Sequence, residues 1–220
     1  MKTLERLIAG KLLKIKAIKL QPANPFTWAS GWKSPIYCDN RKTLSYPDIR
    51  NFIKLELARI IQEKYEEANA VAGVATGAIA QGAMVADLLG LPFVYIRSSP
   101  KDHGLENLIE GELKPGSRVA IIEDLVSTGG SSLKAVNAVR NFGCEVAGML
   151  AIFTYGFPTS EQAFKKAKVT LTALSNYDAV IEEAVRIRYI DESEMAVLQQ
   201  WRKNPAGWKP DTCEYAPLKR

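Results

Sequence analysis

The sequence predicts an α/β protein with a mainly parallel, Rossmann-like sheet flanked by helices. Short apolar runs alternate with helical stretches from residue 70 onward, and glycine-rich turns follow several of the apolar runs. This alternation is typical of parallel sheets, because successive parallel strands need a long crossover, usually a helix. The length of 220 residues suits a single domain over residues 1–220. Ligands of such sheets bind at the carboxyl ends of the strands.

The first elements are expected to be two helices separated by a loop. Residues 4–18 form an amphipathic pattern, and residues 25–40, rich in aromatics, glycine and proline, indicate a loop that leads into a short strand. Ser45 is the expected N-cap of the second helix, with Pro47 in its first turn. Apolar residues then recur at helical spacing: Ile49, Phe52, Ile53, Leu57, Ile60 and Ile61.

The rest of the chain predicts alternating strands and helices. Strands are expected over residues 70–75, 92–96, 118–122, 146–153 and 169–174. A helix over residues 80–89 follows the first of these strands, and a second helix precedes Gly143, which is expected to cap it. The chemistry is therefore expected just after residues 75, 96, 122 and 153.

Composition narrows the class of protein. The formal net charge of +5 is mild and no dense basic stripe is present, so neither nucleic acid nor a membrane is an expected partner. The cysteines Cys38, Cys144 and Cys213 are scattered, without metal-ligand spacing or the even count of a secreted disulfide framework. The N-terminus carries charges every few residues, unlike a signal peptide. A cytoplasmic protein with reduced thiols is expected.

The segment VAIIEDLVSTGGSS, residues 119–132, carries the clearest chemistry. Glu123 and Asp124 follow an apolar run, and adjacent carboxylates can accept hydrogen bonds from vicinal hydroxyls. Gly129 and Gly130 precede a helix, where a tight turn, free N–H groups and the helix dipole favour an anion. A capped helix after a buried strand is the alternative interpretation, and the two consecutive acids disfavour it. Together these features predict a ribose 5-phosphate site.

This segment resembles the 5-phosphoribosyl 1-diphosphate (PRPP) signature of the type I phosphoribosyltransferases. The resemblance implies that residues of this segment bind PRPP, namely Glu123, Asp124, Leu125, Val126, Ser127, Thr128, Gly129, Gly130 and Ser131. It also gives Glu123 and Asp124 a catalytic role beside the ribose. Thr76 and Gly77 occupy the place of the family's diphosphate-binding loop, where backbone N–H groups face the leaving group.

Residues 97–116 form a long polar segment without clear periodicity, and such loops are usually functional or disordered. Residues 101–104 resemble the mobile catalytic loop of orotate phosphoribosyltransferases. The resemblance implies that Arg97, Lys101 and His103 bind the diphosphate, and that Lys101 and His103 act in catalysis. It further implies a homodimer in which residues 98–112 close over the partner's active site.

Residues 26–41 resemble the N-terminal hood of the same family, within a lobe of about residues 1–40. The resemblance implies that orotate contacts Tyr37, Cys38 and Ser127. Some orotate enzymes place an arginine for the orotate carboxylate after the strand that ends near residue 153, where this chain reads Thr-Tyr-Gly. Arg41 and Lys33 are candidate replacements.

The expected reaction transfers phosphoribosyl from PRPP to orotate, giving orotidine 5′-phosphate and diphosphate. Mg²⁺ is the expected cofactor, held mainly by the diphosphate of PRPP rather than by direct protein ligands. A purine phosphoribosyltransferase and a nucleotide-sensing regulator on the same fold are the alternatives.

Overall fold

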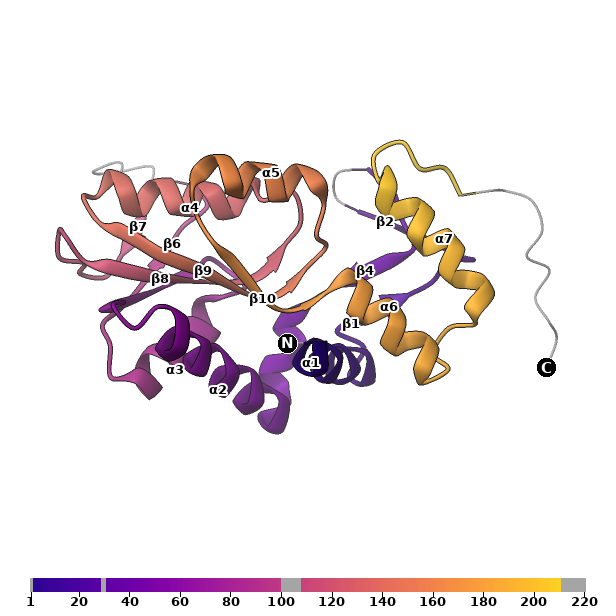
Figure 1. The fold of residues 1–220 in the computed structure, drawn as a ribbon, viewed down its shortest axis with the longest axis horizontal. Coiled ribbons are helices and arrows are strands. Elements are labelled where there is room, and N and C mark those ends of the chain that lie inside the picture. The colour runs from indigo at the N-terminus through magenta and orange to yellow at the C-terminus, as the bar shows by residue number, and fades with distance from the viewer. Residues whose placement is uncertain (1, 29–30, 100–107, 211–220) are drawn as a thin grey trace.

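The computed structural model describes residues 2–28, 31–99 and 108–210. A six-stranded sheet with strand order β10–β9–β8–β5–β6–β7 forms its centre (Figure 1). The strands are β5 (Ala70–Val74), β6 (Phe93–Ile96), β7 (Ile109–Glu110), β8 (Arg118–Val126), β9 (Glu145–Thr154) and β10 (Leu171–Asn176). All neighbouring pairs are parallel except β6 and β7. The predicted mainly parallel α/β fold is confirmed.

Helices cover both faces of this sheet, as Figure 1 shows. One face carries α1 (Lys2–Lys14), α2 (Pro47–Lys64) and α3 (Ile79–Leu89), and the opposite face carries α4 (Gly130–Asn141) and α5 (Pro158–Ala167). Each face has its own hydrophobic core, because side chains alternate along a strand.

Strand β8 shows this alternation directly. Ala120 and Ile122 pack in the cluster that contains α1, α2 and α3, whereas Val119 and Ile121 pack in the cluster that contains α4 and α5. All four side chains are fully buried. The strand is therefore covered on both sides, as is typical of parallel sheets.

A lobe beside the sheet combines segments from both parts of the chain (Figure 1). Its strands pair as β1 (Ile18–Leu20) with β4 (Ile36–Cys38) and as β2 (Phe26–Thr27) with β3 (Lys33–Ser34). The helices α6 (Tyr177–Arg186) and α7 (Glu192–Lys203) belong to the same part of the molecule in Figure 1; α6 packs on α1, and α7 bonds to Lys33 of β3.

Within this lobe, Trp201 joins α7 to the hairpin β2–β3. Its side chain is fully buried, and its Nε1 donates a hydrogen bond of 3.0 Å to the backbone oxygen of Lys33. Its ring lies 5.5 Å from Trp28 and 5.9 Å from Tyr155, centroid to centroid. The lobe thus depends on α7 as well as on the residues before position 40.

Two predicted boundaries near the N-terminus are wrong. The first helix ends at Lys14 rather than at residue 18, because Lys16 adopts a left-handed conformation (φ 54°) and Ile18 pairs with Cys38. Ser45 is the last residue of the 3₁₀ helix η1 (Asn40–Ser45), and Tyr46 is the N-cap of α2. Pro47 does start α2, where its missing N–H costs no hydrogen bond.

Two strand boundaries also differ from the prediction. β10 begins at Leu171 rather than at residue 169, because the N–H of Val169 bonds to Phe164 and closes the end of α5. β8 continues to Val126, past the expected end at residue 122. The second difference changes how the two acidic residues of the site are arranged.

Candidate active site

The segments singled out in the sequence meet at the carboxyl ends of β5, β6 and β8. A cavity of about 400 Å³ lies at this edge of the sheet. Its lining comes from the turn after β5, from β6 and the residues after it, and from β7: Ala75, Thr76, Ile79, Tyr95, Arg97, Ser98, Ser99 and Glu110. The place predicted for the diphosphate is therefore a real hollow in the described structure.

Glu123 and Asp124 lie within β8 rather than after it. Glu123 is in register with Ala151, and Val126 with Thr154, so pairing with β9 continues through both acids. Successive strand residues point to opposite faces. Glu123 bonds to Ser132 on the α4 side and Asp124 packs against the turn after β5, but the two carboxyl groups remain within hydrogen-bonding reach of each other. The expected end of the strand before Glu123 is wrong, whereas the carboxyl groups still lie together.

Glu123 is buried against the start of α4. Its residue exposure is 4 %, and the Ser132 hydroxyl donates a hydrogen bond of 2.9 Å to Oε2. The backbone N–H of Asp124 donates to Oε1 at 3.1 Å. Burial, followed by the negative charge of Asp124, raises the pKa of Glu123 to about 8, against the opposing effect of the Ser132 hydrogen bond. The group is therefore mainly protonated at neutral pH.

Asp124 is half-buried and packs against the turn after β5. A methyl group at Gly77 would overlap the Asp124 carboxylate, so only glycine permits this approach. Asn40 of the lobe contacts the backbone of the same residue, because its Nδ2 donates a hydrogen bond of 2.6 Å to the backbone oxygen of Asp124. Burial raises the pKa of Asp124, while hydrogen bonds and the charge of Arg41 oppose the increase. Asp124 thus joins the turn after β5 to the lobe.

The turn between β8 and α4 has the features of an anion site. Gly129 has a φ of +84°, and a Cβ there would lie 3.1 Å from the Phe164 ring. Gly130 begins α4, and nothing lies within 4 Å of a Cβ added to it. The first N–H groups of a helix have no intrahelical acceptor and attract anions. The side chains of Thr128 and Ser131 are exposed, and that of Ser127 is half-exposed.

Of the three charged or ionisable residues predicted to bind the diphosphate, Arg97 lies within the described residues. It follows β6, lines the cavity and forms an ion pair of 3.4 Å with Glu110. Its N–H bonds to the backbone oxygen of Leu108, which fixes the base of the intervening loop. Lys101 and His103 lie outside the described residues.

The lobe brings Tyr37 and Cys38 near the same edge. Tyr37 is 40 % exposed and its ring lies 5.6 Å from Phe26. Cys38 donates from Sγ to Asn40 Oδ1 at 3.4 Å. Burial, and then the charge of Asp124, keep the pKa of the Cys38 thiol well above its usual value. Cys38 is therefore expected to remain a protonated thiol beside Asp124.

The sequence interpretation missed Asn40. It is buried, although it follows the half-buried Asp39, and its single amide joins two residues: Oδ1 accepts from Cys38 and Nδ2 donates to the Asp124 backbone oxygen. The available signal was a polar residue, Asn40, two positions after the short strand that ends at Cys38. Its partner is 84 positions away in the chain, so only the fold could identify the contact.

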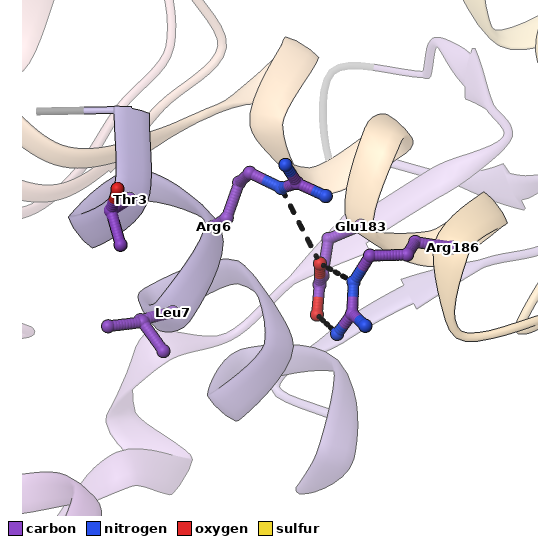
Figure 2. A pocket seen from close by; sticks show the side chains of 5 residues that line it. All are labelled: Thr3, Arg6, Leu7, Glu183 and Arg186. Atoms are coloured by element: carbon purple, nitrogen blue, oxygen red, sulfur yellow. Dashed lines mark hydrogen bonds and ion pairs between the residues drawn. The ribbon is translucent and has the colours of Figure 1, made fainter.

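A second cavity lies between α1 and α6 and is shown in Figure 2. It measures about 360 Å³, and Arg6 and Arg186 both point toward Glu183 in it. Arg186 donates to both oxygens of Glu183, at 2.7 and 2.6 Å. Glu183 is thereby neutralised, and no residue of this cavity belongs to a strand end. It carries none of the chemistry described above.

Comparison with known proteins gives the family. A model of the phosphoribosyl transferase domain matches residues 45–186. The chain is 70 % identical over 208 residues to an orotate phosphoribosyltransferase of Porphyromonas gingivalis, covering 94 % of this chain and 99 % of that protein. It is 51 % identical to one of Listeria innocua, covering 94 % and 99 %.

The chain belongs to the orotate phosphoribosyltransferase family.

Solved structures agree with this assignment to the orotate phosphoribosyltransferases. The orotate phosphoribosyltransferase from Aeropyrum pernix superimposes with a TM-score of 0.73 at 26 % identity, covering 83 % of this chain and 99 % of that one. The adenine phosphoribosyltransferase from Leishmania tarentolae gives 0.59 at 22 % identity, covering 79 % and 90 %, and shares the fold alone. The domain match begins at Ser45, whereas the orotate relatives align with nearly the whole chain, lobe included.

The family assignment confirms the resemblance identified from residues 119–132 and 101–104. It confirms that the chain is a phosphoribosyltransferase enzyme. None of the helices in the described part of the chain is both long and apolar enough to cross a membrane.

Proposed function

We propose that this protein transfers the 5-phosphoribosyl group of PRPP to orotate, forming orotidine 5′-phosphate and releasing diphosphate. The observation that carries the proposal is the position of Asp124. It precedes the glycine-containing turn over residues 127–131 by three positions, packs against Gly77 and accepts a hydrogen bond from Asn40 of the lobe at its backbone oxygen. The identity to curated orotate enzymes supports orotate over a purine as the acceptor.

Each part of PRPP has a matching surface. The 5′-phosphate would accept hydrogen bonds from the turn over residues 127–131, whose glycines leave the backbone accessible. The ribose hydroxyls would donate to Asp124. The diphosphate would occupy the cavity beside Thr76, Gly77 and Arg97. The family resemblance adds Lys101 and His103 to this last group.

Glu123 has a supporting position in this arrangement. It is buried beneath the turn and bonded to Ser132 in the first turn of α4. We propose that it fixes the start of α4 relative to β8 and contributes to the electrostatics of the ribose site through Asp124. Leu125 and Val126 complete the strand and hold the turn in place.

Orotate would bind on the lobe side of Asp124, beside Tyr37, Cys38 and Ser127. A ring nitrogen of orotate bonds to the anomeric carbon and releases its proton to solvent, and the carbon–oxygen bond to diphosphate breaks. Diphosphate leaves with the bonding electrons, and positive charge develops on the ribose ring. The fixed Asp124 carboxylate stabilises that charge, so catalysis here is mainly electrostatic and positional.

Mg²⁺ fits the donor groups at this site. The diphosphate would supply most of its oxygen ligands, and the half-buried Asp124 carboxylate lies beside the diphosphate loop. When bound, the ion would neutralise part of the charge on the leaving group.

We further propose a cytoplasmic homodimer in which residues 98–112 of one subunit close over the active site of the other. The resemblance of residues 101–104 to the family's catalytic loop supports this. The base of the loop, at Arg97 and Glu110, is fixed at the cavity. Closure would exclude water from the activated sugar.

One assay tests the reaction. Purified protein is mixed with PRPP, Mg²⁺ and either orotate, adenine, hypoxanthine or xanthine. Loss of orotate absorbance with matching release of diphosphate is expected, without consumption of the purines. Consumption of a purine while orotate remains unchanged would contradict the proposal.

A further inference from the structure

The acceptor proposed above poses an electrostatic problem. Orotate carries a carboxylate, and the site already contains Asp124, whose carboxylate is half-buried. Two carboxylates in a partly desolvated site repel each other unless a cation lies between or beside them. The described cations of the lobe include Lys33, Arg41, Lys42 and Arg202, which differ in how many of their N–H donors already have hydrogen-bond partners.

Arg41 lies in η1, the turn that touches Asp124. Asn40, its neighbour in the chain, donates to the Asp124 backbone oxygen at 2.6 Å. Asp39 Oδ1 accepts from the backbone N–H of Arg41 at 3.2 Å and from its Nε at 2.7 Å. The guanidinium is therefore oriented by one edge, while its side chain remains 61 % exposed.

The other edge of the guanidinium is available. Among the described residues, neither terminal nitrogen of Arg41 has a hydrogen-bond partner. These two nitrogens form the planar fork that binds a carboxylate through two parallel hydrogen bonds. The charge of Arg41 also reaches the site, because it lowers the pKa of Asp124 against the larger effect of burial.

The rival cations are engaged elsewhere. Arg202 uses one terminal nitrogen for Asp178 and the other for the Gly156 backbone oxygen, at 3.2 Å. Lys33 donates from Nζ to Thr27 at 2.8 Å across the exposed hairpin β2–β3. Lys42 donates to the backbone oxygen of Lys16, at 3.2 Å, on the side of β1. Within the described part of the lobe, Arg41 alone combines a free fork with a position next to Asp124.

We propose that Arg41 binds the carboxylate of orotate through its two terminal nitrogens. Arg41 is then a specificity-determining residue of the proposed reaction, on which this inference rests. Asp39 is a positioning residue, because it binds Nε and leaves both terminal nitrogens without a hydrogen-bond partner among the described residues. Substrates without the carboxylate would gain nothing from Arg41.

The test compares ligands that differ only in that carboxylate. Orotidine 5′-phosphate carries it, and uridine 5′-phosphate does not. The binding of both nucleotides to wild type, Arg41→Gln and Arg41→Lys is measured by titration calorimetry. Arg41→Gln is expected to weaken orotidine 5′-phosphate about 10- to 100-fold, the range for a hydrogen bond to a charged group. The affinity for uridine 5′-phosphate should be unchanged in Arg41→Gln. The affinity of Arg41→Lys for orotidine 5′-phosphate should lie between those of the wild type and Arg41→Gln.

Matched variants complete the experiment. Lys42→Gln removes a charge from the same turn and should leave the preference between the nucleotides unchanged. In steady-state kinetics, Arg41→Gln should raise the KM for orotate much more than the KM for PRPP. An unaltered nucleotide preference in Arg41→Gln would overturn the proposal, as would loss of that preference in Lys33→Gln alone. Failure of the wild type to consume orotate would instead overturn the proposed function.

Discussion

At the scale of single residues, two neighbouring acids of β8 differ in what surrounds them. Asp124 lies between Gly77 and Asn40. Glu123 faces α4 and is nearly inaccessible to solvent. The same chemical group therefore has two different environments one residue apart, and the two carboxyls should respond differently to substitution.

Asp124→Asn is expected to lower kcat far more than it changes the KM for PRPP. The carboxylate matters most when the ribose becomes cationic, so the loss falls on the transition state. A reduction of about 100-fold or more is in the range for removing one stabilising group from an active site. Steady-state kinetics with both substrates saturating would measure it. Unchanged turnover would show that Asp124 has no such role.

Glu123→Gln is expected to change the pH dependence of stability. The folded pKa is about 8 and the ordinary value is 4.5. Between these values the folded state keeps a proton that the unfolded state loses, so the wild type loses stability as pH rises from about 4.5 to 8 and not beyond. The stabilising effect of glutamine should grow by up to about 1.4 kcal/mol per pH unit in that interval.

Denaturant unfolding of the ligand-free protein at pH 5.5 and pH 8 would measure this. Glu66→Gln, at an exposed position, serves as the control and should show no such trend. If Glu123→Gln shifts the free energy of unfolding equally at both pH values, Glu123 is ionised throughout that range in the folded protein.

At the scale of elements, the two glycines in the turn between β8 and α4 differ in backbone geometry and in surroundings. Gly129 has the positive φ and the close contacts with Phe164 and Ser160. Gly130 has ordinary backbone geometry and open space around it. Gly129 is therefore required by the backbone conformation of the turn. At Gly130 the absent side chain leaves open space, which we expect a ligand to occupy.

Gly130→Val is therefore expected to raise the KM for PRPP while the Tm stays nearly unchanged. Gly129→Ala is expected to destabilise the protein by about 1–3 kcal/mol, because alanine is strained at this φ. Thermal unfolding and kinetics on both variants would separate the effects. If Gly130→Val mainly unfolds the protein, the open space at Gly130 does not serve phosphate binding.

The lobe is a second case in which elements from distant parts of the chain cooperate. Trp201 of α7 fills the space between the hairpin and the end of β9, bonding to Lys33 and packing on Tyr155. Through Trp28, whose Nε1 donates to the Ile36 backbone oxygen at 3.1 Å, the same packing reaches β4. The position of η1, and with it Asn40 and Arg41, follows from this packing.

At the scale of the whole molecule, the proposed dimer predicts complementation between two inactive variants. Lys101→Ala should lose most activity by removing charge from the leaving diphosphate, a loss of about 3 kcal/mol or roughly 100-fold in rate. Asp124→Asn is defective in the body of the site. If residues 98–112 act on the partner, a heterodimer of the two variants has one site with both defects and one with neither.

Activity of such a heterodimer should rise toward half that of the wild type. Tagged subunits, refolded together and purified by two affinity steps, would supply verified heterodimers. Homodimers treated in the same way are the control. Verified heterodimers without recovered activity would place the loop over its own subunit's site.

The sequence by itself determined the fold class and the location of the chemistry. Apolar runs alternating with helical stretches are local patterns, and the parallel sheet follows from them because each crossover needs a helix. Residues 119–132 carry their glycines, acids and hydroxyls in one continuous segment, so they predict a PRPP site without any tertiary contact. Pro47 at the start of α2 and Gly143 after α4 are likewise local effects.

Only the tertiary structure decided how the site is assembled. Pairing with β9 extends β8 past residue 122, so that Glu123 packs under α4 while Asp124 packs against Gly77, and no local pattern reveals where a strand's partner ends. Asn40 reaches Asp124 across 84 positions, and α7 supports the hairpin β2–β3 across 168. The sequence named Arg41 and Lys33 as equal candidates. Their hydrogen bonds distinguish them, because a sequence does not show which N–H donors of a cation are already bonded to other residues and which remain for a ligand.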